Sequence, residues 1–349
     1  MAIAGLPSIV DFARMCAPDG SPALHIAQLL SQCNQIMKDL IYREGNLPLG
    51  NKITVGTGLP QGTWRGANAG VGFSKMLTAQ LEDSIGELVG YSGVDRSIAE
   101  IGGDVAKFRY RQDMAHIEGL SQQISTALIY SNEAVNPGQI TGFMPRYNTV
   151  NTATAMNAVN VIDAGGTASA NASILLVSWG DNTTYAIHPK GTPAGITYED
   201  KGDVRALYDA SNNQFEGYTS YFRIKIGLSV EDWRYNVRIA NIDTTAAGLK
   251  GTTPPDLNVL IAQAVGKLPS TNRRIFGAEE TDDPSDPKPG TNPVLYCNRT
   301  VREWLDIQAI RDKNVLITPK EYAGETVLEW RGIPIRLVDS MLNTESRVV

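Results

Sequence analysis

The sequence predicts an α+β fold, because helical and strand-like patterns occupy separate stretches of the chain. Apolar residues recur at helical spacing over residues 22–40 and again over residues 104–131. Apolar and polar residues alternate over residues 218–230, within a β-rich centre, and the C-terminal third mixes both patterns. Hydrophobic residues make up 42% of the 349 positions, which is enough for a sizeable core in one large or two medium domains.

The first predicted helix begins at Ser21 and Pro22, an N-cap residue followed by proline at the first helical position. We expect it to end near Gly45. Its apolar stripe consists of Ile26, Leu29, Leu30, Cys33, Ile36, Met37 and Leu40.

The second predicted helix, residues 104–131, spans roughly 40 Å at a rise of about 1.5 Å per residue. Gly119 lies in its interior, where glycine costs about 1 kcal/mol relative to alanine.

Strand-like runs fill much of the remaining chain. Residues 51–84 predict a long two-stranded hairpin with a loose tip. Residues 174–179 and 184–188 flank a Gly-Asp-Asn turn and predict a second hairpin, and residues 233–242 are expected to continue the sheet. In the C-terminal third we expect a helix over residues 254–268, a strand over 292–297, a helix capped by Asn298 or Thr300, and a hairpin of residues 326–330 and 333–338 around Arg331-Gly332.

Charge and cysteine content limit the class of protein. The formal net charge is −6, so the molecule as a whole is not built to bind polyanions. Three cysteines are too few and uneven for a disulfide framework and fit a reducing compartment. We expect no secretory signal, because the first residues lack a basic region, and no apolar run approaches the roughly 20 residues that span a bilayer.

Residue patterns typical of catalysis or metal binding are missing from the sequence. His25, His116 and His188 stand in no metal-ligand spacing, and there is no Gly-x-Ser-x-Gly elbow. The glycines at 56–62 depart from the dinucleotide fingerprint, and the acidic residues 279–290 lack the order of a calcium loop, which favours a solvated loop. We therefore expect no enzymatic activity, no cofactor and no metal.

Residues 56–72 form a glycine-rich segment that carries Trp64 and Arg65, with Asn68 close behind. A loop this rich in glycine cannot form a core of its own, yet Trp and Arg are enriched among interface hot spots. The segment has two interpretations. It is an arm that lies on another subunit, or Trp64 tucks into its own domain with Arg65 stacked on the ring. Composition alone does not decide between them.

A basic cluster, Lys107, Arg109 and Arg111, lies near the start of the second predicted helix. Three cations within five residues could face nucleic acid. The alternative is a solvated helix face, which is the commoner role of such a cluster.

Several short motifs, in order along the chain, resemble the major capsid proteins of tailed bacteriophages, most of all the short-tailed epsilon-fifteen kind. Each motif is weak alone, but their common order covers nearly the whole chain. The motifs lie within residues 30–46, 57–71, 179–196, 231–243 and 332–345.

This resemblance implies the Hong Kong ninety-seven capsid fold, with an N-arm, an extended loop, a peripheral domain with a spine helix, and an axial domain. The expected boundaries are 1–48 for the N-arm, 49–84 for the extended-loop hairpin, 85–244 for the peripheral domain with spine helix 104–131, 245–340 for the axial domain and 341–349 for a C-terminal tail.

The resemblance also implies a function. The chain would assemble with copies of itself into hexamers and pentamers of an icosahedral shell, which encloses double-stranded DNA without sequence-specific binding. It would do so in the host cytoplasm, remain in the virion capsid, and work with a separate scaffolding protein, a portal and a cement protein, without any membrane. The implied subunit-interface residues are Trp64, Arg65, Asn68, Ile26, Leu30 and Met37.

Two other functions stay open on the sequence. A bacterial nanocompartment shell protein would share the fold. A β-rich virion decoration or attachment protein would use residues 172–240 as its binding module.

Overall fold

The computed structural model describes most of the chain. The described residues are 32–101, 104–167, 169–201, 205–208, 212–245, 248–251, 254–269, 292–311, 317–322 and 325–349.

Helices and strands are both abundant, as the sequence predicted. The helices are α2 (Ile36–Asp39), α3 (Arg96–Ile101), α4 (Val105–Tyr130), α5 (Phe143–Arg146), α6 (Leu257–Lys267) and α8 (Arg299–Arg311), with the 3₁₀ helices η1 (Met156–Asn160) and η2 (Trp233–Tyr235). The strands are β1 (Tyr42–Glu44), β2 (Gly50–Gly58), β3 (Leu77–Asp95), β4 (Val161–Asp163), β5 (Asn171–Trp179), β6 (Thr184–His188), β7 (Ile196–Asp200), β8 (Arg205–Tyr208), β9 (Gln214–Val230), β10 (Asn236–Asp243), β11 (Asn292–Cys297), β12 (Ile317–Tyr322), β13 (Glu325–Trp330) and β14 (Ile333–Leu337).

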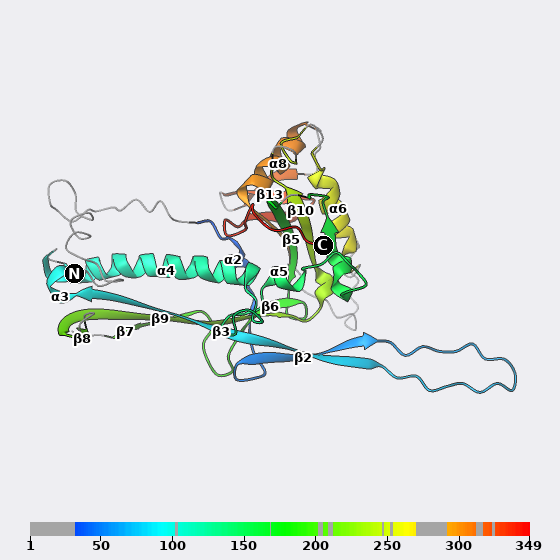
Figure 1. Cartoon of the computed structure of the whole chain (residues 1–349), viewed down its shortest axis with the longest axis horizontal. Helices are drawn as coiled ribbons and strands as arrows, with labels where there is room; N and C mark the ends of the chain where they lie inside the picture. The colour runs from blue at the N-terminus through cyan, green and yellow to red at the C-terminus, as the bar shows by residue number, and fades with distance from the viewer. Residues whose placement is uncertain are drawn as a thin grey trace.

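Three parts are visible in Figure 1. A compact body holds β5, β10 and β13 with helices α6 and α8. An elongated arm leaves the body on one side, where α4 runs along the ribbon of β3 and β9. The hairpin of β2 and β3 projects on the other side.

A continuous path of hydrogen-bonded strands links the three parts, in the order β12-β13-β14-β11-β5-β6-β9-β3-β2. Strand β9 pairs with β3 in antiparallel register from Ile85↔Gly227 to Asp95↔Gly217. Its other edge pairs in turn with β6, β7 and β8. The arm is therefore a narrow sheet that grows out of the body.

Helix α4 covers one face of this narrow sheet. Asp104 caps its N-terminus by accepting a hydrogen bond from the backbone N–H of Lys107. Leu120, Ile124 and Leu128 are buried on the side that meets the sheet. The burial of β9 alternates from Ser220 to Ile226, as expected of a strand with one covered face. Both the helix predicted over residues 104–131 and the strand predicted over residues 218–230 are present.

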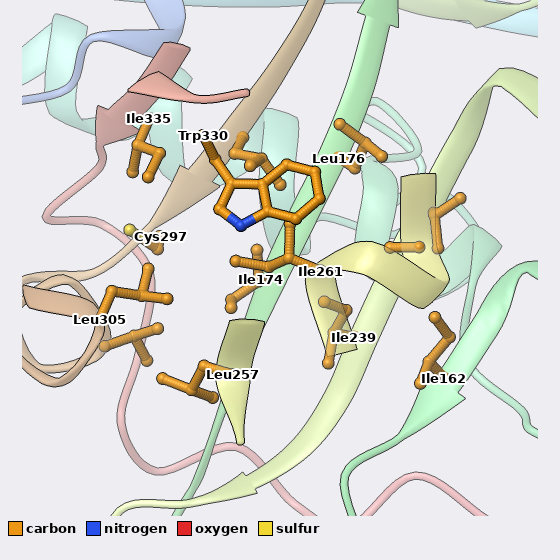
Figure 2. Packing of buried hydrophobic residues seen from close by; sticks show 14 of the residues in the cluster. Ile162, Ile174, Leu176, Ile239, Leu257, Ile261, Cys297, Leu305, Trp330 and Ile335 are labelled. Atoms are coloured by element: carbon orange, nitrogen blue, oxygen red, sulfur yellow. The ribbon is translucent and has the colours of Figure 1, made fainter. Parts of the chain in front are cut away.

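The larger core lies inside the body, between strands β5, β10 and β11 and helices α6 and α8 (Figure 2). Asp256 caps α6 by accepting hydrogen bonds from the N–H groups of Asn258 and Val259. The core residues that Figure 2 labels are Ile162, Ile174, Leu176, Ile239, Leu257, Ile261, Cys297, Leu305, Trp330 and Ile335.

A second core joins the body to the arm, because the other face of β5 packs against α5 and the C-terminal half of α4. Trp179 is 1% exposed, meets Phe143 edge-to-face at 5.9 Å, and donates its indole N–H to the Tyr296 hydroxyl at 2.7 Å. Burial of this size fixes the base of α4 on the body.

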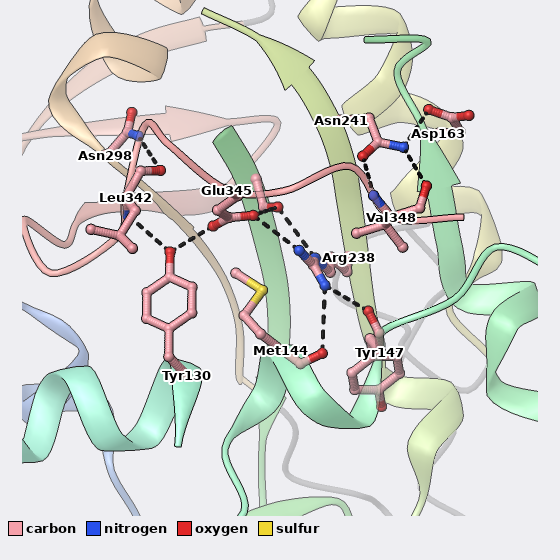
Figure 3. Close-up of polar contacts among 11 residues, drawn as sticks. Tyr130, Met144, Tyr147, Asp163, Arg238, Asn241, Asn298, Leu342, Glu345 and Val348 are labelled. Atoms are coloured by element: carbon pink, nitrogen blue, oxygen red, sulfur yellow. Dashed lines mark hydrogen bonds and ion pairs between the residues drawn. The ribbon is translucent and has the colours of Figure 1, made fainter. Parts of the chain in front are cut away.

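The last residues of the chain lie across the junction between arm and body (Figure 3). Glu345 accepts from Arg238 at 2.9 Å and from the Tyr130 hydroxyl at 2.6 Å, with the Arg238 and Glu345 side chains only 5% and 6% exposed. Asn241 exchanges two hydrogen bonds with the backbone of Val348. Strand β10 and the end of α4 are thereby held by one C-terminal segment.

The N-terminal helix prediction is wrong where the structure describes it. Helix α2 covers only Ile36–Asp39, and β1 follows where a helix was expected to continue. The backbone of residues 33–35 pairs instead with residues 337–339, through Asp339 N to Cys33 O and Gln35 N to Leu337 O. Backbone groups that bond to a distant strand cannot also bond within a helix.

The hairpin predicted from residues 174–179 and 184–188 is also wrong. The strands exist as β5 and β6, but they meet only at Trp179↔Thr184. β5 pairs with β10 and β11, and β6 pairs with β1 and β9. Every residue of β5 is buried, so its backbone N–H and C=O groups need hydrogen-bond partners on both edges. Strands β10 and β11, which are distant in the sequence, supply them.

Other C-terminal predictions are confirmed. Asn298 caps α8 by accepting from the N–H of Val301 at 2.9 Å. β13 and β14 form the expected hairpin around Arg331 and Gly332, whose φ angles of 47° and 85° fit a two-residue turn with both central residues left-handed. Within the described part of the chain, no helix is long and apolar enough to cross a membrane.

Replacing Ile239 by alanine tests the larger core. Ile239 is 0% exposed, so we expect Ile239→Ala to lower the free energy of unfolding by about 2 to 5 kcal/mol. Urea unfolding of the isolated subunit measures this. The control Ile310→Ala, at a position that is 81% exposed, should change stability by less than about 0.5 kcal/mol. Equal losses in the two variants would contradict the assignment of the core.

Candidate functional site

The hairpin of β2 and β3 is the most distinctive surface of the chain. The two strands pair in antiparallel register from Gly50↔Ser84 outward, which confirms the hairpin predicted over residues 51–84. The pairing gives the ribbon one polar face, with Lys52 opposite Glu82, and one apolar face, with Ile53 opposite Leu81. Leu81 is 47% exposed, so the apolar face is incompletely covered within the subunit.

The tip of the hairpin, residues 59–76, lies beyond the paired strands. Trp64 and Phe73 have the exposure of free side chains, at 102% and 109%, and Arg65 is exposed beside them. Asn68 occupies a turn with a φ of 64°. The interpretation in which Trp64 tucks into its own domain is therefore wrong, because the tip touches no core to receive it.

The base of the hairpin is held by a buried polar network. Asp83 is 7% exposed and accepts from Arg146 at 2.7 Å and from Ser229 at 2.9 Å. Asn51 donates to the Tyr185 hydroxyl at 2.9 Å and to Ser229 at 3.2 Å. The network ties β2 and β3 to α5, β6 and β9, so the direction of the hairpin is set at its base while the tip stays exposed.

Close backbone packing accompanies this network. A Cβ atom on Gly50 would lie 2.8 Å from the carbonyl oxygen of Asp83, and one on Gly227 would lie 2.6 Å from that of Ser84. Only glycine fits at both positions, because the obstructing atoms belong to the backbone and cannot move aside.

The predicted interface residues of the N-arm do not lie with the tip. Met37 is in α2, half-buried, and packs against the second core of its own subunit. Ile26 and Leu30 fall outside the described residues. The structure thus brings Trp64, Arg65 and Asn68 together at the tip and places Met37 on the body.

The basic cluster on α4 does not form one face. Residues 107 and 111 are four apart and share a side of the helix, while residue 109 points to the other side. Arg109 forms an ion pair with Asp200 at 2.5 Å and lies over the Tyr218 ring at 5.1 Å, with its side chain 16% exposed. The charge of Arg109 is therefore paired within the arm. Lys107 and Arg111, on the other side of α4, are the residues of the cluster that stay candidates for contact with DNA.

Phe73 and Leu59 are functional candidates that the sequence argument did not single out. Both lie in the tip, and Leu59 is 82% exposed. A sequence signal for Phe73 was present, because this residue directly follows Gly72, the last residue of the glycine-rich segment. Large apolar side chains that are this exposed on a projecting loop mark a surface for another molecule.

Among the described residues, no group of three or more His, Cys, Asp and Glu side chains could hold a metal ion. His116 stacks on Phe222, and the Nδ1 atom of His188 lies 3.3 Å from the carbonyl oxygen of Pro189. Burial raises the pKa of the Cys297 thiol to about 12, so this cysteine stays protonated and unreactive.

A compact body, a long helix laid along a narrow sheet and a projecting hairpin together define a subunit of the Hong Kong ninety-seven capsid fold. The sequence model of the major capsid protein GP7 family matches residues 17–349. The chain belongs to this family and is a subunit of a bacteriophage capsid shell.

One solved structure agrees with this assignment, and two others are more distant. A chain of bacteriophage epsilon15 is similar over 100% of this chain and 99% of its own, with 31% sequence identity and a TM-score of 0.75. The bacteriophage JBD30 capsid matches 93% of this chain and 96% of its own, with 10% identity and a TM-score of 0.46. The SrpI encapsulin of Synechococcus elongatus matches 69% and 96%, with 10% identity and a TM-score of 0.40.

The family assignment rests on the family match and on the epsilon15 chain, because the other two likenesses are too distant to carry an argument. No curated protein sequence matches the chain.

Removing the charge of Arg146 tests the network at the base of the hairpin. We expect Arg146→Met to lower the free energy of unfolding by about 3 to 5 kcal/mol, because it leaves Asp83 buried without its cation. Thermal and urea unfolding of the subunit measure the loss. The control is Arg96→Met, which breaks exposed ion pairs and should cost less than about 1 kcal/mol. A similar small loss for both would show that the network does not hold the hairpin.

Proposed function

We propose that this capsid subunit forms the hexamers and pentamers of an icosahedral shell around double-stranded DNA, and that its hairpin lies over a neighbouring subunit. The observation that carries the proposal is the hairpin itself, whose base is held by buried hydrogen bonds while Trp64 and Phe73 at its tip are fully exposed. Trp64, Arg65 and Asn68 are the contact residues that we assign to this surface.

The division of the chain follows from the same proposal. Residues 1–48 form the N-arm, 49–84 the extended loop, 85–244 the peripheral domain, 245–340 the axial domain and 341–349 the tail. The cut at residue 244 falls at the end of β10, and the larger core unites β5 and β10 with α6, β11 and α8. We therefore propose that β5 and β10 pack as part of the axial unit, although they precede the cut.

The proposed partners follow from the shell. We propose assembly in the host cytoplasm with a separate scaffolding protein, a portal and a cement protein. The net charge of −6 fits a wall that contains DNA without binding it tightly or by sequence. The work of the subunit is complementarity between copies, so we propose no enzymatic activity and no cofactor.

Neither alternative function gains support. A nanocompartment shell would share the fold, but the family match is to a phage capsid protein. In a decoration or attachment protein, residues 172–240 would be a free binding module. In the structure every residue of β5 and most of β6 are buried, whereas β7 and the outer end of β9 carry exposed residues.

Alanine at Trp64 tests the intersubunit role of the tip. We expect Trp64→Ala to weaken assembly by about 2 kcal/mol or more per contact, because a desolvated aromatic anchor is lost, and to leave the stability of the subunit unchanged. Light scattering during assembly and urea unfolding of the subunit measure the two effects. The control is Gln61→Ala in the same tip. Normal assembly of a subunit that unfolds more easily would contradict the proposed contact.

Electron microscopy tests the shell itself. The protein, expressed with and without its scaffolding protein, should form closed shells or rings of subunits. A protein that stays monomeric in both cases would contradict the proposed function.

A further inference from the structure

Residues 338–349, which we call the strap, lie across the junction between the arm and the body (Figure 3). Isolated bridges involve Val338 and Glu345, and the rest of the strap forms neither helix nor strand. Its path is therefore set by the residues that it contacts. Met341 is 3% exposed and packs with Val338 in the second core, which also contains the C-terminal half of α4.

The strap is fixed to the body by backbone and charged contacts. Glu345 exchanges two backbone hydrogen bonds with Asn171 of β5, at 2.9 and 3.2 Å, and its carboxylate pairs with Arg238 of β10. The side chain of Asn241, also in β10, holds the backbone of Val348 by two more hydrogen bonds. Moving the strap would leave Arg238 as a buried charge without its partner, which is costly. The strap therefore behaves as a part of the body.

Two hydroxyl groups of α4 reach the strap. The hydroxyl of Tyr130, the last residue of the helix, donates to the Glu345 carboxylate at 2.6 Å and accepts from the backbone N–H of Leu342 at 2.8 Å. Ser125 is 0% exposed, and its Oγ atom lies 2.7 Å from that of Ser340. A hydrogen bond tolerates changes of only about 0.5 Å in its donor–acceptor distance, so these contacts are met at one orientation of α4.

Apolar packing alone leaves the orientation of α4 less defined. The second core attaches the helix to the body through Ile124 and Leu128, but apolar attraction is non-directional and survives a small rotation. The helix has 26 residues and is about 39 Å long at a rise of roughly 1.5 Å per residue. A rotation of about 5° at its C-terminal end would move its N-terminal end by about 3 Å. The hydroxyl contacts at the root of the arm therefore limit the position of its far end.

The angle between arm and body matters in an assembly of identical subunits. Each copy repeats the same shape, so a small change in this angle alters the direction from every copy to the next in the same way. In a closed shell the change of direction between copies is the curvature, and the curvature sets the diameter. A loosely held arm would give shells of mixed diameter from one and the same chain.

We propose that the strap sets the angle between arm and body through the hydroxyl groups of Tyr130 and Ser125, and that Tyr130 thereby determines the curvature of the shell. Tyr130 is a positioning residue, because it acts through the direction of the arm and not through a contact with another subunit. This inference rests on the proposed function and adds to it the part of the fold that controls the size of the assembly.

Distances within the isolated subunit test the first part of the proposal. Spin labels on Ala106→Cys and Ile310→Cys, both at exposed positions, report the end of the arm against the body by pulsed electron paramagnetic resonance, in a background with Cys16→Ser and Cys33→Ser. Tyr130→Phe should at least double the width of the distance distribution, because the arm loses its polar contact with the strap. An unchanged width would contradict the proposal.

Shell diameters test the second part. Electron micrographs of wild-type shells should give one narrow distribution, and Tyr130→Phe should make it at least twofold wider or prevent closure. The matched control is Tyr110→Phe, which removes the same hydroxyl from a 65% exposed position of α4 and should change neither the diameters nor the spin-label distances. Closed Tyr130→Phe shells with the wild-type distribution would overturn the role of the strap and leave the shell function intact. Failure of the wild-type chain to form shells would instead count against the function itself.

A reversible bond between α4 and the strap gives a rescue. Ser125→Cys and Ser340→Cys place two sulfur atoms where the Oγ atoms lie 2.7 Å apart, close enough for a disulfide. When this pair is added to Tyr130→Phe in the same cysteine background, its oxidised form should restore the wild-type diameters, and reduction before assembly should bring the defect back. A pair that does not oxidise, or an oxidised variant that keeps the defect, would show that the strap does not hold the arm.

Discussion

The antiparallel ladder between β3 and β9 is the interaction on which the rest of the subunit depends. It runs from Ile85↔Gly227 at the body to Asp95↔Gly217 at the end of the arm. One face of the ladder receives α4, and the inner end of β9 enters the body beside β6. The same strand β3 continues past the body to form the hairpin with β2. A single long strand therefore carries the arm and the hairpin, and its pairing sets the direction of both.

Two buried polar networks fix the points where these projections meet the body. Asp83 and Arg146 hold the base of the hairpin, and Arg238 and Glu345 hold the C-terminal segment against Tyr130 of α4. Such networks add little net stability, because the desolvation of each charge offsets most of the attraction. These networks instead fix the direction of the projections, since the buried charges are paired and hydrogen-bonded in only one arrangement of the elements that carry them. A shell subunit needs this property, because a small error in direction is magnified along a long projection.

The framework leaves the tip of the hairpin open. Trp64 and Phe73 there have the exposure of free side chains. No group of three or more His, Cys, Asp and Glu side chains that could hold a metal ion lies among the described residues. The buried charges hold the projections in place, and the exposed apolar side chains of the tip are the surface that we propose for contact with another subunit.

The sequence by itself determined the elements whose pattern is local. Periodicity located α4 and the alternating half of β9, turn chemistry located the hairpin at Arg331-Gly332, and the glycine-rich run located the tip. Tertiary structure decided what depends on distant partners. Residues 33–35 left the predicted helix to pair with residues 337–339, and Arg109 left a supposed basic face to meet Asp200. The residue pattern of a short segment indicates whether it suits a helix or a strand. Which distant segment it pairs with depends on burial across the whole chain.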